Sequence, residues 1–185
     1  AKCKICENNL DDKIFYTDYL NISYSRCEFC ELVYQSNLFK KDNEKEIKAI
    51  YDTSYYEHYS LISDDLINRE VQYGLDKNLI CNYFDDNEGK KILDYGCGNG
   101  NFLNYFKSQK FGYDINKSIV KKDNINYIIK DEINNQKFDL IMMRGVIEHI
   151  KNFDEILKDL FKCVNPNGYF FITATPNPSC YSFKL

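Results

Sequence analysis

The sequence predicts an α/β fold, in which a parallel sheet is preceded by a small cysteine-rich module. From about residue 90 onward, short apolar runs alternate with helical or loop segments, which is the pattern of parallel strands joined by crossover connections. A loop with three glycines follows the first run, and two C-x-x-C pairs lie near the start of the chain. We expect residues 1–36 to form the cysteine module, residues 37–87 a tyrosine-rich segment and helical linker, and residues 88–185 the sheet domain.

Five strands are expected in the sheet domain, at Lys91–Tyr95, Phe111–Tyr113, Asn126–Ile129, Phe138–Met143 and Tyr169–Thr173. Helices are expected at Asn101–Ser108, Lys117–Lys122 and Phe153–Cys163. Apolar residues at helical spacing predict one long helix over residues 61–84, or two helices broken near Gly74. Asn152 and Glu155 at the start of the last helix resemble a capping box. The run Asn165-Pro166-Asn167-Gly168 is expected to turn the chain into the fifth strand.

Composition and charge narrow the class of protein. The formal net charge is −4, whereas a protein that grips nucleic acid usually shows a basic surplus. No apolar run approaches the length of a membrane span, and the first residues lack a signal-peptide core. We therefore expect a cytoplasmic protein without a nucleic-acid or membrane partner. Because that compartment keeps thiols reduced, the eight cysteines favour metal ligation or burial over a disulfide framework.

The glycine loop after the first strand is the most informative segment. Gly96, Gly98 and Gly100 stand at alternate positions, so the backbone can turn sharply and approach a ligand closely. The dinucleotide fingerprint G-x-G-x-x-G does not fit, because the third glycine comes one residue early and Asn101 follows it. Asp94 would repel a pyrophosphate but suits the cationic amino-acid end of a methionine-derived ligand. A P-loop is excluded, since no Gly-Lys-Ser/Thr follows.

A second carboxylate, Asp114, follows the second strand. At that position it can accept hydrogen bonds from both hydroxyls of a ribose. Different nucleoside cofactors all contain such a ribose. Asp114 therefore predicts a nucleoside ligand but does not identify which one. The alternative is that Asp114 caps the next helix.

Three runs together resemble class I S-adenosylmethionine-dependent methyltransferases: Leu-Asp-x-Gly-Cys-Gly-x-Gly, Gly-Tyr-Asp-Ile, and Phe-Asp-x-Ile followed by Val-Ile-Glu-His-Ile. The match extends from about residue 88 to residue 178 in order and spacing. The resemblance implies a Rossmann-like fold with S-adenosylmethionine as cofactor. It also implies the cofactor-binding residues, which are Asp94, Gly96, Cys97 and Gly98 at the methionine end, Asp114 at the ribose, Asp131 at the adenine amino group and Arg144 at the end of the fourth strand.

Glu148 and His149 are the candidate catalytic residues. They follow the fourth strand, at the carboxyl edge where open α/β sheets bind ligands. The imidazole can take a proton from a nucleophile while the carboxylate orients it. Methyl transfer also depends on in-line positioning. In related enzymes the Glu-His pair often shapes the pocket instead, and both roles stay open.

Four cysteines near the start of the chain have the spacing of a zinc site. Cys3 and Cys6 form one C-x-x-C pair, and Cys27 and Cys30 form the other. Thiolates at this spacing complete a tetrahedral Zn²⁺ site of the zinc-ribbon kind. Because four protein ligands leave no open coordination position, we expect a structural metal.

The cysteine module followed by a Tyr-Tyr-x-x-Tyr segment resembles bacterial methyltransferases of sugar and cell-surface polysaccharide biosynthesis. That resemblance implies a small sugar-like acceptor and a lid formed by the tyrosines, which are Tyr51, Tyr55, Tyr56 and Tyr59, with His58 among them. The alternative is that these aromatic residues pack over the core. Three competing functions stay open: an RNA methyltransferase, an NAD-dependent oxidoreductase, and a non-catalytic cofactor-binding or assembly module.

Class I methyltransferase sheets carry two further strands after the fifth. The sequence ends at Leu185, shortly after the fifth predicted strand. We therefore expect either a truncated chain or a partner chain that covers the exposed edge of the fifth strand.

Overall fold

The computed structural model describes residues 2–3, 5–11, 13–17, 23–35, 63–117, 119–150 and 152–175. The predicted tyrosine lid, from Tyr51 to Tyr59, lies outside these residues. So does everything beyond residue 175. Within the described ranges, no helix is both long enough and apolar enough to cross a lipid bilayer.

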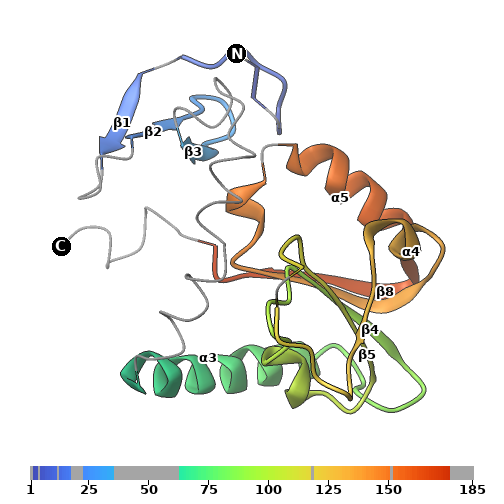
Figure 1. The fold of residues 1–185 in the computed structure, drawn as a ribbon. Coiled ribbons are helices and arrows are strands. Elements are labelled where there is room, and N and C mark those ends of the chain that lie inside the picture. The colour runs from blue at the N-terminus through green and yellow to red at the C-terminus, as the bar shows by residue number, and fades with distance from the viewer. Residues whose placement is uncertain are drawn as a thin grey trace.

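A five-stranded sheet forms the centre of the larger domain (Figure 1). Its strands are β4 (Lys91–Tyr95), β5 (Gln109–Tyr113), β6 (Asn126–Tyr127), β7 (Phe138–Arg144) and β8 (Val164–Thr173). Their order is β6-β5-β4-β7-β8, and every neighbouring pair is parallel. The predicted Rossmann-like parallel sheet is therefore confirmed.

Helices cover both faces of this sheet (Figure 1). On one face, α3 (Ser63–Cys81) and the 3₁₀ turn η1 (Phe102–Tyr105) contribute to a core that includes Ile92. On the other face, α4 (Lys130–Asn134) and α5 (Phe153–Lys162) pack over Leu93. Adjacent residues of one strand thus enter opposite cores, which explains why the strands read as continuous apolar runs.

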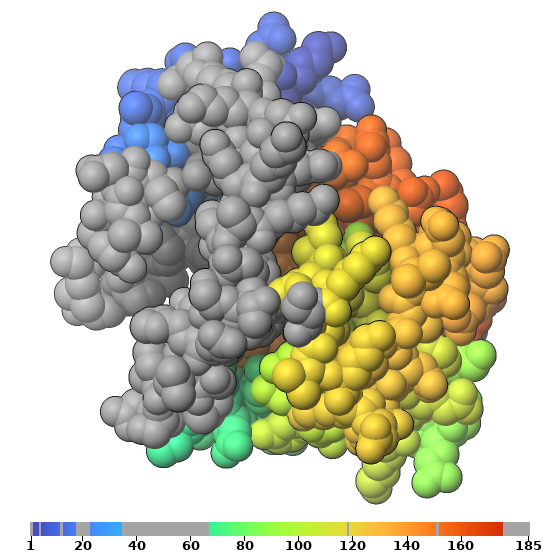
Figure 2. Space-filling model, in the orientation of Figure 1, coloured from blue at the N-terminus to red at the C-terminus, as the bar shows by residue number. Residues whose placement is uncertain are grey.

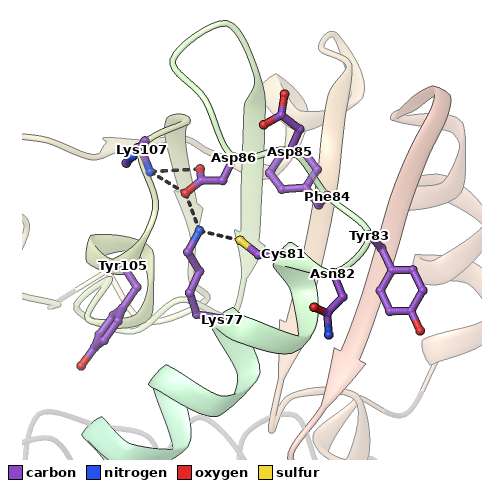
Figure 3. Close-up of a pocket in the computed structure, with 9 residues that line it drawn as sticks. All are labelled: Lys77, Cys81, Asn82, Tyr83, Phe84, Asp85, Asp86, Tyr105 and Lys107. Carbon is purple, nitrogen blue, oxygen red and sulfur yellow. Dashed lines mark hydrogen bonds and ion pairs between the residues drawn. The ribbon is translucent and has the colours of Figure 1, made fainter.

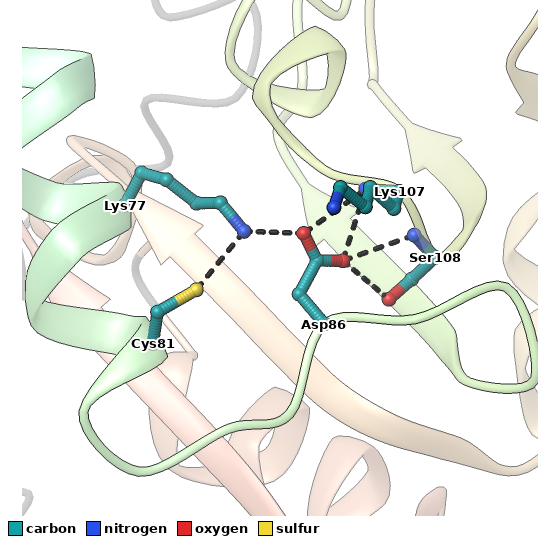
Figure 4. Close-up of polar contacts among 5 residues, drawn as sticks. All are labelled: Lys77, Cys81, Asp86, Lys107 and Ser108. Atoms are coloured by element: carbon teal, nitrogen blue, oxygen red, sulfur yellow. Dashed lines mark hydrogen bonds and ion pairs between the residues drawn. The ribbon is translucent and has the colours of Figure 1, made fainter.

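Of the predicted helices, one is shorter than expected and another does not form among the described residues. In both segments, side chains from outside the predicted helix accept backbone N–H groups. The Asn101–Ser108 segment is helical only over η1, since Asp86 accepts hydrogen bonds from the backbone of Lys107 and Ser108 (Figure 4). Residues 119–122 form no helix, because the backbone N–H of Val120 donates to Asn99 and that of Lys122 donates to the Tyr127 hydroxyl. The third, α5, is confirmed.

Helix α3 continues unbroken through Gly74, so the alternative of one long helix is confirmed. Three smaller features differ from the sequence expectations. The short helix α4 was not predicted. Asn152 donates to the Glu155 carboxylate instead of capping the α5 backbone. The expected turn after α5 is part of β8, where Asn167 adopts φ +65° and the register with β7 shifts.

The cysteine-rich module is a separate three-stranded antiparallel sheet, which lies at the blue end of the molecule in Figure 2. Its strands are β1 (Ile14–Thr17), β2 (Ser23–Arg26) and β3 (Val33–Gln35). A small core holds them together, and its buried members are Cys3, Leu10, Cys27 and Tyr34.

Candidate cofactor site

Three of the predicted cofactor residues, Asp94, Asp114 and Arg144, lie together at the carboxyl edge of the sheet. Asp94 in β4 pairs with Gly112 in β5 and with Met142 in β7. Asp114 and Arg144 each lie two residues beyond those partners, so the parallel register places both beside the end of β4. Open α/β sheets bind ligands at this edge.

The glycine loop leaves β4 in a conformation that needs glycine. Gly96 has φ +87° and Gly100 has φ +70°, in the left-handed region that side chains disfavour. A Cβ atom at Gly96 would lie 2.4 Å from Val146 Cγ2. The backbone N–H groups of Gly96 and Cys97 both donate to the Tyr113 carbonyl, at 2.7 and 3.0 Å. The end of β5 therefore fixes the start of the loop.

Asp114 fastens the next part of the loop. Its Oδ2 accepts the Gly98 N–H at 2.8 Å, and its Oδ1 accepts the Asn116 N–H at 2.8 Å. Burial raises the pKa of Asp114, while these two N–H groups act in the opposite direction. Each carboxylate oxygen has a second lone pair, so this arrangement leaves acceptor capacity for ribose hydroxyls.

Asp94 carries the feature that points most directly to a ligand. The residue is 3% exposed, and its Oδ1 has no hydrogen-bond partner among the residues that the structure describes. Burial raises the pKa of Asp94 to about 7, with the Arg144 charge opposing and the Asp114 charge reinforcing the shift. A buried carboxylate oxygen without a partner is costly. The ammonium group of an amino-acid-bearing cofactor would satisfy it.

Arg144 does not point freely into the site, because helix α3 holds it. Its Nε lies 2.8 Å from Asp76 Oδ2. Asp76, which is 68 positions away along the chain, was not among the predicted site residues. A local signal did exist: Asp76 falls between Tyr73 and Ile80 on the helix face that packs against the sheet. A carboxylate on such a face requires a partner.

Cys97 and Asp131 occupy less direct positions. The Cys97 sulfur lies under the loop, where a Cβ added at Gly112 would approach it to 2.8 Å. Burial raises the pKa of the Cys97 thiol, with Asp94 and Asp114 adding to the shift. Asp131 is exposed in the first turn of α4, which follows β6. Its predicted contact with adenine stays a prediction.

Glu148 and His149 lie together on the 3₁₀ turn η2 (Ile147–His149), just after β7. His149 Nε2 is 3.9 Å from Glu148 Oε1, which is longer than a hydrogen bond. Thr175 donates to the other Glu148 oxygen at 3.3 Å. The His149 side chain is 44% exposed, and its partial burial lowers its pKa while Glu148 opposes that shift. A neutral, accessible imidazole is able to accept a proton.

A separate hollow of about 620 Å³ lies before the amino end of β4, at the edge opposite the glycine loop (Figure 3). The side chains of Tyr83 and Tyr105 line it, with Lys77 and Asp86 between them. Lys77 forms an ion pair with Asp86, and Asp86 also accepts hydrogen bonds from the Ser108 backbone and hydroxyl. These polar groups fasten α3 to the start of β5, so the hollow is distinct from the candidate cofactor site.

The four module cysteines form a compact cluster. Their sulfur atoms all lie within 4.8 Å of one another, with Cys3–Cys30 at 3.5 Å and Cys6–Cys27 at 3.6 Å. Tetrahedral zinc with Zn–S bonds of about 2.3 Å places sulfur atoms about 3.8 Å apart, so the cluster fits the ion.

The two cysteine loops share one backbone form. In each, the N–H of the residue after the second cysteine bonds the carbonyl of the first: Glu7 to Cys3 at 3.0 Å, and Glu31 to Cys27 at 2.9 Å. Both glutamates adopt a positive φ, 60° and 62°. This repeated geometry presents two cysteines from each loop to a common point.

The fold and the site define a class: an open parallel α/β domain with a glycine loop and two carboxylates at its carboxyl edge. The chain belongs to the methyltransferase-domain family, whose model matches residues 67–184. The match contains helix α3 from residue 67 onward and the whole five-stranded sheet.

Two curated proteins to which the chain is similar are methyltransferases by name. A malonyl-acyl-carrier-protein O-methyltransferase of Calditerrivibrio nitroreducens is 29% identical over 130 residues, covering 65% of this chain and 49% of its own length. A ubiquinone biosynthesis O-methyltransferase of Rickettsia typhi is 30% identical over 131 residues, covering 62% and 52%. The chain thus spans about half the length of these relatives.

Among solved structures, phosphoethanolamine N-methyltransferase 1 of Haemonchus contortus, in complex with phosphoethanolamine and S-adenosylhomocysteine, gives a TM-score of 0.49. Its sequence identity is 17%, and the alignment covers 69% of this chain and 31% of that one.

Proposed function

We propose that this domain binds S-adenosylmethionine and takes part in transferring its methyl group to a small-molecule acceptor. The Oδ1 atom of Asp94, which has no hydrogen-bond partner in the described part of the chain, carries the proposal together with the glycine loop that Asp114 holds. Membership of the methyltransferase-domain family supports the same conclusion.

In this proposal each residue binds a different part of the cofactor. Asp94 binds the ammonium of the methionine end, and Gly96 and Gly98 allow the backbone to approach it closely. Asp114 accepts the ribose hydroxyls, and Asp131 binds the adenine amino group. The bound cofactor would supply an activated methyl group, while the chain's residues bind and orient it.

Glu148 and His149 act on the acceptor side. The exposed imidazole and its pKa, lowered by burial, favour a neutral base. We propose that His149 takes the acceptor proton, and comparing His149→Ala with His149→Gln tests this. If both variants keep full turnover and unchanged cofactor binding, the pair only shapes the pocket.

We propose an oxygen of a sugar-like or surface-polysaccharide precursor as the acceptor. The O-methyltransferase names of two relatives support an oxygen acceptor. The sugar assignment rests on the resemblance of the cysteine module and the tyrosine segment to that group of enzymes. We also propose a cytoplasmic location, and a partner chain along the outer edge of β8, which pairs only with β7 among the described strands.

We further propose that the four cysteines bind one structural Zn²⁺. Their sulfur spacing and the two matching backbone loops support this. With four protein ligands the ion would stabilise the module and take no part in the chemistry.

Calorimetric titration of the zinc-loaded chain with S-adenosylhomocysteine and with NAD tests the cofactor proposal. We expect saturable binding of S-adenosylhomocysteine, loss of that binding in Asp114→Ala, and none for NAD. Binding of NAD alone would overturn the proposal. Transfer of a labelled methyl group to candidate acceptors then tests activity, and cofactor binding without transfer to any acceptor would favour a non-catalytic module.

A further inference from the structure

A buried ion pair joins helix α3 to the end of β7. Arg144 Nε lies 2.8 Å from Asp76 Oδ2, and the two side chains are only 17% and 6% exposed. Gln72, one helical turn before Asp76, donates to the other carboxylate oxygen at 3.0 Å. Both oxygens of Asp76 are therefore engaged, and the carboxylate is fixed in one orientation.

Aromatic rings fix the guanidinium group as well. Arg144 Cζ lies 4.6 Å from the centroid of the Tyr73 ring and 5.7 Å from that of Phe102. A planar guanidinium stacks well on such rings. Its charge thus stays on the α3 side of the site.

Several ionisable groups surround Asp94. Asp114 faces it from the end of β5, Arg144 from the end of β7, and Cys97 from the glycine loop, with Asp76 behind Arg144 on α3. Arg144 supplies the positive charge that favours ionised Asp94. Nevertheless, Asp94 Oδ1 has no hydrogen-bond partner among the described residues, while Arg144 donates to Asp76.

We propose that Asp76 is a positioning residue, which holds the Arg144 guanidinium away from Asp94 and keeps the Asp94 carboxylate open for the ammonium group of the cofactor. Arg144 then acts on Asp94 through its charge alone. Without Asp76, the guanidinium would turn to the nearest carboxylate and occupy the oxygen that the ligand needs. This inference rests on the proposed cofactor function.

The proposal predicts a distinctive pH dependence. The ammonium of S-adenosylhomocysteine binds ionised Asp94, so affinity rises with pH as Asp94 loses its proton, near pH 7 in the native chain. If Asp76 is neutralised, the charge of Arg144 acts on Asp94 alone and favours its ionised form more strongly. The rise in affinity then moves to lower pH. If Arg144 is neutralised as well, Asp94 loses its positive neighbour, and the rise moves to higher pH.

Asp76→Asn is the test, measured by titration with S-adenosylhomocysteine between pH 6 and pH 9. We expect affinity at least about tenfold weaker at pH 7, the scale of one lost charged hydrogen bond. The chain offers a matched control in Asp86→Asn, which breaks the Lys77–Asp86 pair of the same helix at the opposite sheet edge (Figure 4). The burial of that pair is alike, at 16% and 7% exposure. The control should lower the melting temperature while leaving affinity and pH profile unchanged.

The double variant Asp76→Asn/Arg144→Gln separates positioning from a purely structural role. Removing both charges of a buried pair is far better tolerated than removing one, so this protein should fold even if Asp76→Asn does not. We expect its affinity to recover at high pH, because no guanidinium competes for Asp94.

Three outcomes would overturn the inference: unchanged affinity in Asp76→Asn, equal losses in Asp76→Asn and Asp86→Asn with the native pH profile, or no recovery in the double variant. If the native chain binds no S-adenosylhomocysteine at any pH, the proposed function itself fails, and this inference fails with it.

Discussion

Asp94→Asn should stabilise the cofactor-free protein while abolishing cofactor binding. Asp94 is buried at the end of a central strand, and its Oδ1 has no hydrogen-bond partner among the residues described. An ionised carboxylate in that position is costly, and asparagine keeps its shape without the charge. The cofactor site thus lowers the free energy of unfolding of the ligand-free protein, and Asp94→Asn removes that loss.

The magnitude follows from the pKa of Asp94, which burial raises from 3.8 to about 7. Between these values the folded chain holds a proton that the unfolded chain has released, so stability falls as pH rises from about 4 to about 7. About three pKa units at about 1.4 kcal/mol each give a ceiling of about 4 kcal/mol. The variant lacks this loss, so its advantage should grow from near zero at pH 4 to about 2–4 kcal/mol at pH 8.

Urea unfolding at several pH values measures this difference, with the far-UV circular dichroism of α3 and α5 as the signal. Asp139→Asn is a matched control, in which the change in stability should have the opposite sign. The pKa of Asp139 is lowered by the hydrogen bonds that its carboxylate accepts from the Lys91 backbone and the Asn165 side chain. Its ionised form therefore stabilises the fold at neutral pH, and the control should be less stable there. An advantage of Asp94→Asn that does not change with pH would refute the reasoning.

Three further predictions concern other parts of the chain. Native protein should carry one zinc per chain by elemental analysis, and Cys27→Ser should lose it; a metal-free native chain with an intact module would contradict the zinc site. Gly112→Ala should lower the free energy of unfolding by about 1–3 kcal/mol, because its Cβ would lie 2.8 Å from Cys97 Sγ, and adding Cys97→Ala should restore most of the loss; equal stability of all three proteins would refute the clash. If His149 is the base, turnover should fall on the acid side of its pKa, and that limb should be absent in His149→Gln; an identical limb in the variant would exclude the role.

The strands were predictable because their signals are local. The runs at β4 and β7 are apolar on both faces, as buried parallel strands must be. The shortened helix at residues 101–108 and the absent one at residues 119–122 show the opposite case. Asp86 takes the backbone N–H groups of Lys107 and Ser108, and Asn99 takes that of Val120, over separations of about 21 residues. Local propensity does not contain such contacts, so the helix prediction could not anticipate them.

The candidate site likewise has a part that was predictable from local motifs and a part that was not. The glycine loop, Asp94 and Asp114 follow from motif spacing, since each strand end must reach the same edge of a parallel sheet. The position of the Arg144 side chain does not, because it depends on Asp76, far upstream in the sequence. The helical spacing of Tyr73, Asp76 and Ile80 indicates that Asp76 needs a partner, but nothing in the sequence identifies that partner as Arg144.

A buried ion pair such as Asp76–Arg144 is weak evidence for stability, because the cost of removing two charges from water offsets most of their attraction. We infer that the pair contributes to the site by fixing the position of the Arg144 charge. The guanidinium is close enough to Asp94 to favour ionisation, yet it donates to Asp76 and rests on Tyr73. Because the Arg144 charge lies nearby but its N–H groups do not hydrogen-bond to Asp94, Asp94 remains able to bind an incoming ammonium group. Direct pairing of Arg144 with Asp94 would give Oδ1 the partner that it lacks among the described residues, and would close the site.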